Sequence, residues 1–143
     1  RAQNWLRQEK SYRAFGNQLG RDATPAEADL PRFIDLSKEF NGKVEMEALG
    51  VRSKCVTLLI DGPNDADPWG REALYDGDTK VGRLTSGGYS VAFNKSIGMG
   101  YVSPELAVVG QKLKVKMLNQ LWNAEIVEDS PYDPKNTTIR VDG

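Results

Sequence analysis

The residues that could do chemistry in this chain are mainly carboxylates, because the sequence has no histidine and one cysteine. Without histidine, Ser-His and Cys-His nucleophile pairs and histidine metal sites are excluded. Cys55 has no CxxC partner, which also excludes the usual zinc and redox-dithiol sites. Acidic neighbours such as Glu128 and Asp129 would point to opposite sides of a strand. We therefore expect no self-contained catalysis by this chain.

The acidic loop from Asp65 to Gly70 imitates the start of a calcium-binding EF-hand loop. Trp69 stands where an oxygen ligand is needed, and Asp76 occupies the twelfth position, where an EF-hand has glutamate. No helical pattern flanks the loop. We interpret it as a turn-rich connection, not as a calcium site.

A glycine- and serine-rich segment, from Gly82 to Val102, carries the most specific pattern. Residues 81–86 alternate as in a half-buried strand, and Gly87-Gly88 permits positive φ, which favours a reversal there. The alternative is a phosphate-binding loop. Such a loop opens a helix, and residues 89–93 do not resemble a helix start. A hairpin in a barrel is the favoured interpretation.

From Val51 onward the pattern is one of short strands separated by turns. We expect strands at 54–61, 72–75, 80–86, 112–117 and 121–127, in addition to the segment that follows the glycine pair. Asp76-Gly77-Asp78 is a hairpin turn signal. Six or so strands at this spacing predict a mainly β fold, a small antiparallel barrel.

The first fifty residues are expected to form a small α/β segment. Helices are predicted at 4–12 and at 43–49, where Gly50 would end the helix. Thr24-Pro25-Ala26-Glu27 has the pattern of a capping box, which predicts a short helix from Pro25. A strand is predicted at 32–36. The change of pattern after residue 50 predicts two parts, 1–50 and 51–143.

The charge balance excludes several classes of partner. The chain has 19 Lys and Arg against 20 Asp and Glu, which gives no electrostatic basis for binding nucleic acid or an anionic membrane. No run of about 18 apolar residues predicts a membrane span. The lysines of 112–117 have no aromatic residues between them for stacking on bases, so we expect a solvated barrel face. Arg1, in place of a methionine, suggests a piece of a longer protein.

Two parts of the sequence resemble the aminomethyltransferase family, which includes glycine-cleavage T-proteins and the folate domains of dimethylglycine and sarcosine dehydrogenases. The order L-R-x-E-K-x-Y-R, T-P-x-E-A and F-x-G-K in residues 6–43 is similar to the dimethylglycine dehydrogenase branch, although Gln8 replaces a leucine, Gln18 an acidic residue and Asp29 a glycine. Val91 replaces a usual proline of the barrel signature. That signature is otherwise kept at Thr85, Ser86, Gly87, Ser90, Lys95, Ile97, Gly98, Tyr101 and Val102.

The resemblance implies a folate-dependent one-carbon step. An upstream domain with FAD would oxidise an N-methylated glycine, and the C-terminal half would capture the one-carbon unit on tetrahydrofolate. The family's pterin-binding glutamate maps onto Glu9, and a cation that contacts folate in some members maps onto Lys38. The family's nucleophile-orienting aspartate lies upstream of this segment. The isolated chain is therefore expected to be inactive.

Other interpretations remain open. The chain could be a non-catalytic structural or docking barrel, or the C-terminal part of a stand-alone T-protein that takes its one-carbon unit from a lipoyl carrier. From the residues alone, Glu9 would be an exposed helix carboxylate paired with Arg13 at i+4. We expect the parent protein in the cytoplasm, or in the mitochondrial matrix if it is eukaryotic; the single cysteine fits a reducing compartment.

Overall fold

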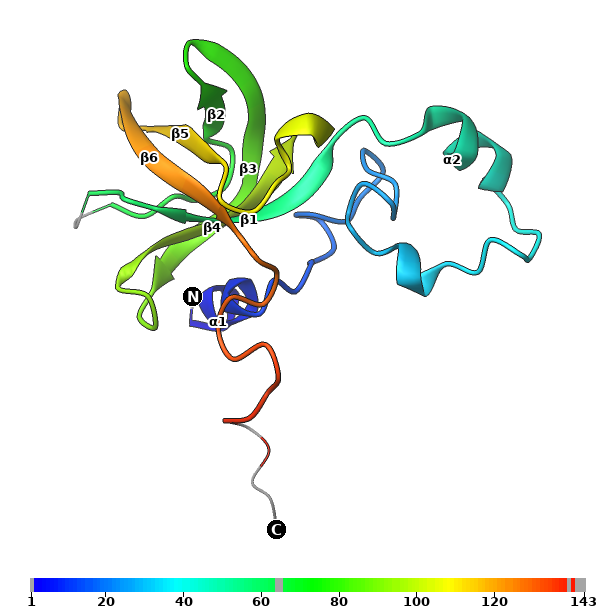
Figure 1. Ribbon diagram of the computed structural model, residues 1–143, viewed down its shortest axis with the longest axis horizontal. Helices are drawn as coiled ribbons and strands as arrows, with labels where there is room; N and C mark the ends of the chain where they lie inside the picture. The colour runs from blue at the N-terminus through cyan, green and yellow to red at the C-terminus, as the bar shows by residue number, and fades with distance from the viewer. Residues whose placement is uncertain (1, 64–65, 139, 141–143) are drawn as a thin grey trace.

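Six antiparallel strands close into a barrel in the computed structural model, which describes residues 2–63, 66–138 and 140 (Figure 1). Each strand is hydrogen-bonded to two neighbours in the closed order β1-β4-β3-β2-β5-β6. The predicted fold class, a mainly β chain with a six-stranded antiparallel barrel, is confirmed. The strands are β1 (Lys54–Ile60), β2 (Ala73–Asp76), β3 (Thr79–Ser90), β4 (Lys95–Val102), β5 (Lys112–Met117) and β6 (Gln120–Val127).

Alternation along the strands fills the barrel interior with apolar side chains. In β5 every second side chain is buried, while its three lysines face outward as expected. Leu58, Leu84 and Ile126 belong to the same buried cluster. Because burying such a side chain stabilises a fold by about 1.5–3 kcal/mol, this core holds the barrel together.

Strands β3 and β4 approach each other so closely that they require glycine. A Cβ on Gly82 would overlap the carbonyl oxygen of Tyr101. The expected reversal at Gly87-Gly88 is wrong, because both glycines lie inside β3. The chain reverses at residues 91–94 instead, where Asn94 has a φ of 52°.

Short helices and turns make up the residues before the barrel. Helix α1 (Ala2–Glu9) packs against β3 and β4. The 3-10 turn η1 (Pro31–Phe33) and helix α2 (Lys43–Leu49) lie on an arm that projects from the barrel (Figure 1). A second 3-10 turn, η2 (Pro104–Leu106), follows β4. None of the helices in the described ranges has the length and apolar character needed to cross a membrane.

The helix predicted at 43–49 is confirmed, and two other predicted helices differ. Helix α1 ends at Glu9, ahead of the predicted end at residue 12, since Ser11 has a φ of 52°. The capping box forms, with the backbone NH of Glu27 donating to Thr24 Oγ1 over 3.2 Å. Residues 25–29 nevertheless form only turns, because Asp29 has a φ of 59°.

The strand predicted at 32–36 is wrong. Pro31 begins the 3-10 turn η1, and Phe33 ends it. Within the described part of residues 2–50, no segment forms a strand that could pair with 32–36. The expected α/β segment is therefore made of two short α-helices and turns.

Candidate functional site

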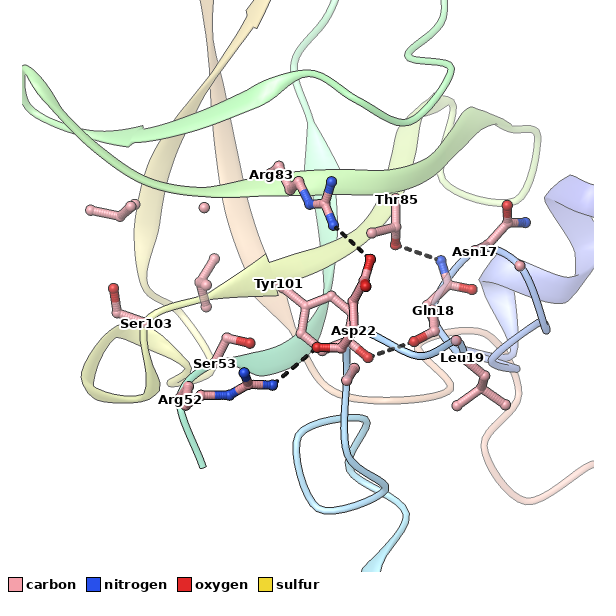
Figure 2. A pocket seen from close by; sticks show the side chains of 16 residues that line it. Asn17, Gln18, Leu19, Asp22, Arg52, Ser53, Arg83, Thr85, Tyr101 and Ser103 are labelled. Carbon is pink, nitrogen blue, oxygen red and sulfur yellow. Dashed lines mark hydrogen bonds and ion pairs between the residues drawn. The ribbon is translucent and has the colours of Figure 1, made fainter. Parts of the chain in front are cut away.

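Two signature residues of β3, Thr85 and Ser86, form hydrogen bonds with Gln18 of the N-terminal segment. The buried amide of Gln18 donates from Nε2 to Thr85 Oγ1 over 2.8 Å and to Ser86 Oγ over 2.6 Å. The Tyr101 hydroxyl donates to the backbone oxygen of Gln18 over 2.6 Å (Figure 2). Gln18 thus joins the turn after α1 to the barrel, at a position where the family pattern has an acidic residue.

The glycine pair of β3 lets α1 and a barrel loop lie directly on the strand. A Cβ on Gly88 would overlap the ring of Trp5, and one on Gly87 would lie 2.6 Å from the carbonyl oxygen of Pro68. Asn4 Nδ2 also donates to the Gly87 oxygen over 3.3 Å. Because β3 continues to Ser90 without opening a helix, close packing explains these glycines better than phosphate binding.

Glu9 lies at the end of α1, where the barrel covers it. Its side chain is buried, with the residue only 5% exposed, and Oε1 accepts a hydrogen bond from Ser90 Oγ over 2.5 Å. The predicted alternative, an exposed pair with Arg13, is not formed. Arg13 Nη1 instead lies 2.6 Å from Asp129 Oδ2, and Nη2 lies 3.7 Å from Asp29 Oδ2. Glu9 is therefore a buried carboxylate without a basic partner among the described ion pairs.

A cleft of about 880 Å³ opens beside Glu9. Its walls include Leu6, Tyr12 and Tyr132, which are all exposed. The backbone NH of Tyr132 donates to the backbone oxygen of Glu9 over 3.2 Å, and Lys10 Nζ donates to Asn136 Oδ1 over 2.9 Å. These bonds hold the segment after β6 against α1. The result is a mainly apolar cleft lined also by the acidic residue Glu9 and the basic residues Arg7 and Lys10. Of these, Glu9 is the residue that can accept hydrogen bonds from the N–H donors of a flat ring.

Lys38 is not brought into this cleft. Its ammonium group is exposed on the arm, 3.5 Å from Asp35 Oδ2. It lines a separate hollow of about 640 Å³ together with Phe33 and Phe40. The two residues that the resemblance assigns to folate binding, Glu9 and Lys38, therefore lie in different hollows.

Another hollow, of about 350 Å³, lies between residues 16–23 and the barrel (Figure 2). Arg83 Nη2 lies 4.0 Å from Asp22 Oδ2, and Arg52 Nη2 donates to the Asp22 backbone oxygen over 3.0 Å. Arg52 Nε also lies 2.9 Å from Oε1 of the buried Glu27. Since both arginines already have acidic partners, we favour the cleft beside Glu9 as the ligand site.

The described residues hold no group of three or more His, Cys, Asp or Glu side chains suited to a metal ion. Cys55 is buried, and burial raises the pKa of its thiol to about 12. A thiol with so high a pKa is protonated at neutral pH and is a poor nucleophile.

Gln8, which precedes Glu9 in α1, is expected to destabilise the folded chain. It is fully buried, and its Nε2 donates to the Asn4 oxygen over 3.1 Å, but its Oε1 has no hydrogen-bond partner among the described residues. We expect Gln8→Leu, the residue of the family pattern, to stabilise the chain by about 1 kcal/mol and to raise Tm by roughly 3 to 6 °C in calorimetry. Gln3→Leu, at an exposed position of α1, is the control and should bring no gain. A lower Tm for Gln8→Leu would contradict the prediction.

Comparisons with known proteins place this architecture in a family. Residues 53–133 match the glycine cleavage T-protein C-terminal barrel domain. Dimethylglycine dehydrogenase, mitochondrial, from Rattus norvegicus is 36% identical over 151 aligned residues, which cover 99% of this chain and 17% of that protein. Aminomethyltransferase from Aquifex aeolicus (strain VF5) is 32% identical over 116 residues, which cover 81% of this chain and 33% of that protein.

A solved structure shows the same fold. The glycine cleavage system aminomethyltransferase T from Bartonella henselae matches with a TM-score of 0.82 at 22% identity, over 93% of this chain and 38% of that chain. This chain thus spans between 17% and 38% of the lengths of these relatives. Since the family match covers more than half of its residues, the chain belongs to the glycine cleavage T-protein C-terminal barrel family.

Proposed function

We propose that this chain is the C-terminal part of a tetrahydrofolate-binding, aminomethyltransferase-like domain in a larger flavoprotein. In that protein it would help to capture the one-carbon unit released by oxidative demethylation of an N-methylated glycine. The observation that carries the proposal is Glu9, a buried acidic residue that helps to line a mainly apolar cleft and maps onto the family's pterin-binding glutamate. The similarity to dimethylglycine dehydrogenase over 99% of the chain supports the flavoprotein context.

The cleft has the chemistry that a pterin needs. A pterin presents adjacent N–H donors from its amino group and ring nitrogen, and a carboxylate accepts such a pair through two parallel hydrogen bonds. Oε1 of Glu9 has two lone-pair directions, so it can accept a ligand N–H as well as the Ser90 hydroxyl. Tyr12 and Tyr132 supply aromatic surface for the faces of the ring. Glu9 would therefore orient the pterin.

We also propose that the upstream part of the parent chain completes the site and holds FAD. The arm supports this, because Phe33 is 72% exposed and Val44 is 71% exposed, and none of the residues 31–51 is buried. Apolar side chains gathered in this way indicate a surface that another part of the protein covers. On this proposal, residues 1–50 end the folate-binding domain and residues 51–143 form the barrel domain.

Lys38 enters the proposal as a second folate contact, supported only by its place in the family pattern. Its exposed ammonium group on the arm could meet the carboxylates of the folate tail once the upstream domain is in place. A eukaryotic parent would lie in the mitochondrial matrix, which fits the word mitochondrial in the name of the rat relative, and a bacterial parent would lie in the cytoplasm. The second candidate is the end of a stand-alone T-protein, favoured by the similarity to bacterial aminomethyltransferases.

A titration tests the proposed function. Isothermal calorimetry should show that tetrahydrofolate binds the full-length parent, and that it binds the 143-residue chain at least tenfold more weakly, because the chain supplies only one wall of the site. The control ligand is p-aminobenzoylglutamate, which lacks the pterin edge and should bind the parent more weakly than tetrahydrofolate. The isolated chain should turn over neither dimethylglycine nor an aminomethyl donor. A parent that does not bind tetrahydrofolate would refute the proposal.

A further inference from the structure

Ser90 joins the barrel to the candidate ligand carboxylate by a hydrogen bond of defined direction. The backbone NH of Phe93 points to Ser90 Oγ at 3.4 Å, so this oxygen acts there as an acceptor. Its own proton is then donated to Glu9 Oε1, over 2.5 Å. Ser90 is fully buried and Glu9 is 5% exposed, so water has little access to compete for this bond. The hydroxyl group therefore fixes the position of one carboxylate oxygen.

The spacing of residues on α1 and β3 places these two groups together. Trp5 and Glu9 are four residues apart, so they lie on one face of the helix, about 6 Å apart along its axis. Gly88 and Ser90 are two residues apart on one face of β3, about 6.6 Å along the strand. The two spacings match, so the Trp5 ring packs on Gly88 while the Glu9 carboxylate accepts the hydrogen bond from Ser90. The packing of the Trp5 ring on Gly88 thus sets the position along β3 at which the Glu9 carboxylate lies, which is beside Ser90.

The second carboxylate oxygen is left for a ligand. Among the described residues, Ser90 is the side chain that donates to Glu9, and Oε2 accepts no hydrogen bond. Glu9 also lines the cleft of about 880 Å³. With Oε1 held from the barrel side, rotation of the carboxylate is restricted before a ligand arrives. Preorganisation of this kind lowers the entropy cost of binding.

We infer that Ser90 is a positioning residue of the proposed folate site: its hydroxyl holds the Glu9 carboxylate in the orientation that receives the pterin edge. This inference rests on the proposed function. It gives the barrel signature a role in ligand binding, through Glu9, without contact between Ser90 and the ligand. The competing explanation is that Ser90 only satisfies a buried carboxylate and serves the fold.

A double-mutant cycle in the full-length parent separates the two explanations. Dissociation constants for tetrahydrofolate are measured for Ser90→Ala, Glu9→Ala and the double variant, with Tm recorded for each. We expect Ser90→Ala to weaken binding about tenfold, since hydrogen bonds to charged groups are among the stronger ones. In the Glu9→Ala background, Ser90→Ala should weaken binding no further. Ser96→Ala, at a buried serine of β4 without a hydrogen bond to Glu9, is the control and should bind as the parent does.

Each outcome supports or contradicts the inference. A parent that does not bind tetrahydrofolate refutes the proposed function itself. If the parent binds it and Glu9→Ala leaves the affinity unchanged, the assignment of Glu9 to the folate site fails and the inference fails with it. If Glu9→Ala weakens binding but Ser90→Ala does not, or if the two effects are independent, only the inference fails. Should Ser90→Ala not fold, Ser90→Cys replaces it, because a thiol is a weaker donor of similar size. It should weaken binding in the same direction by a smaller factor, and an affinity equal to that of the parent would contradict the inference.

Discussion

Replacing Glu9 with glutamine in the full-length parent is expected to weaken tetrahydrofolate binding by at least tenfold. The amide turns one acceptor into a donor, so one N–H of the pterin edge loses its partner at a cost of roughly 1 to 3 kcal/mol. A loss of 1.4 kcal/mol already corresponds to a factor of about ten in the dissociation constant. Calorimetric titration of the variant and of the parent measures the difference directly.

The fold should tolerate this change, because the Ser90 hydroxyl can still donate to the amide oxygen of the new side chain. We therefore expect Tm to change by less than about 3 °C. Glu105→Gln is the matched control, an exposed glutamate of η2 whose replacement should alter neither affinity nor Tm. An unchanged affinity in Glu9→Gln would leave the cleft without an assigned ligand group. A large fall in Tm would instead show that the carboxylate mainly serves the fold.

The barrel could be predicted from the sequence because its strands carry their own pattern. In Lys112–Met117, alternation alone separates the buried from the exposed face. The residues before the barrel lack such a pattern. Their structure is decided by contacts with residues that are far away in the sequence. Phe33 and Ile34 suggested a strand by composition, but the arm has no strand beside it within the described residues, and Pro31 begins a 3-10 turn. The division at residue 50 stays a prediction.

The glycine pair in β3 also shows that local sequence patterns do not reveal contacts between distant residues. Gly87-Gly88 suggested a turn, since glycine is the residue that most often reverses a chain. In the structure the pair is needed because Trp5 and Pro68 lie against it. Local reasoning cannot distinguish these two uses of glycine, because the second depends on residues far away in the sequence.

For the candidate site, the resemblance supplied Glu9, and local reasoning predicted an exposed ion pair for it. What the sequence could not show was that β3 buries this carboxylate and that Ser90 binds it. A signal was present in the spacing, with Trp5 and Glu9 one helical turn apart and Gly88 and Ser90 two strand positions apart. It could be used only once α1 was known to lie on β3.

Glu27 is expected to make the stability of the chain depend on pH in the acid range. Its side chain is fully buried, and it accepts hydrogen bonds from Arg52 Nε over 2.9 Å, from the Arg52 backbone NH over 3.0 Å and from the Thr24 backbone NH over 2.8 Å. The hydrogen bond from the Arg52 side chain, working against burial, lowers the pKa of Glu27 from 4.5 to about 2. The backbone oxygen of Glu27 also accepts from the Cys55 NH over 2.8 Å, so this residue joins the N-terminal segment to β1.

Because the folded protein holds this carboxylate ionised to lower pH than the unfolded chain does, its contribution is fully present above about pH 4.5. The contribution is lost as the pH falls from there to about 2, where the folded protein is protonated as well. A depression of this size corresponds to a contribution on the order of 3 kcal/mol. Glu27→Gln should therefore unfold more easily at neutral pH, and the difference from the wild type should shrink steadily below pH 4.5.

Urea unfolding followed by tryptophan fluorescence, at intervals from pH 7 to pH 2, measures both curves. The difference between the two proteins isolates Glu27, because other carboxylates such as Asp133, whose pKa is also lowered to about 2, titrate in both. Glu47→Gln, at an exposed position of α2, should follow the wild-type curve throughout. Parallel curves for Glu27→Gln and the wild type would show that the pair with Arg52 gives the fold no pH-dependent stability. At Glu27, the link between the N-terminal segment and β1 would then rest on the backbone hydrogen bond from the Cys55 NH.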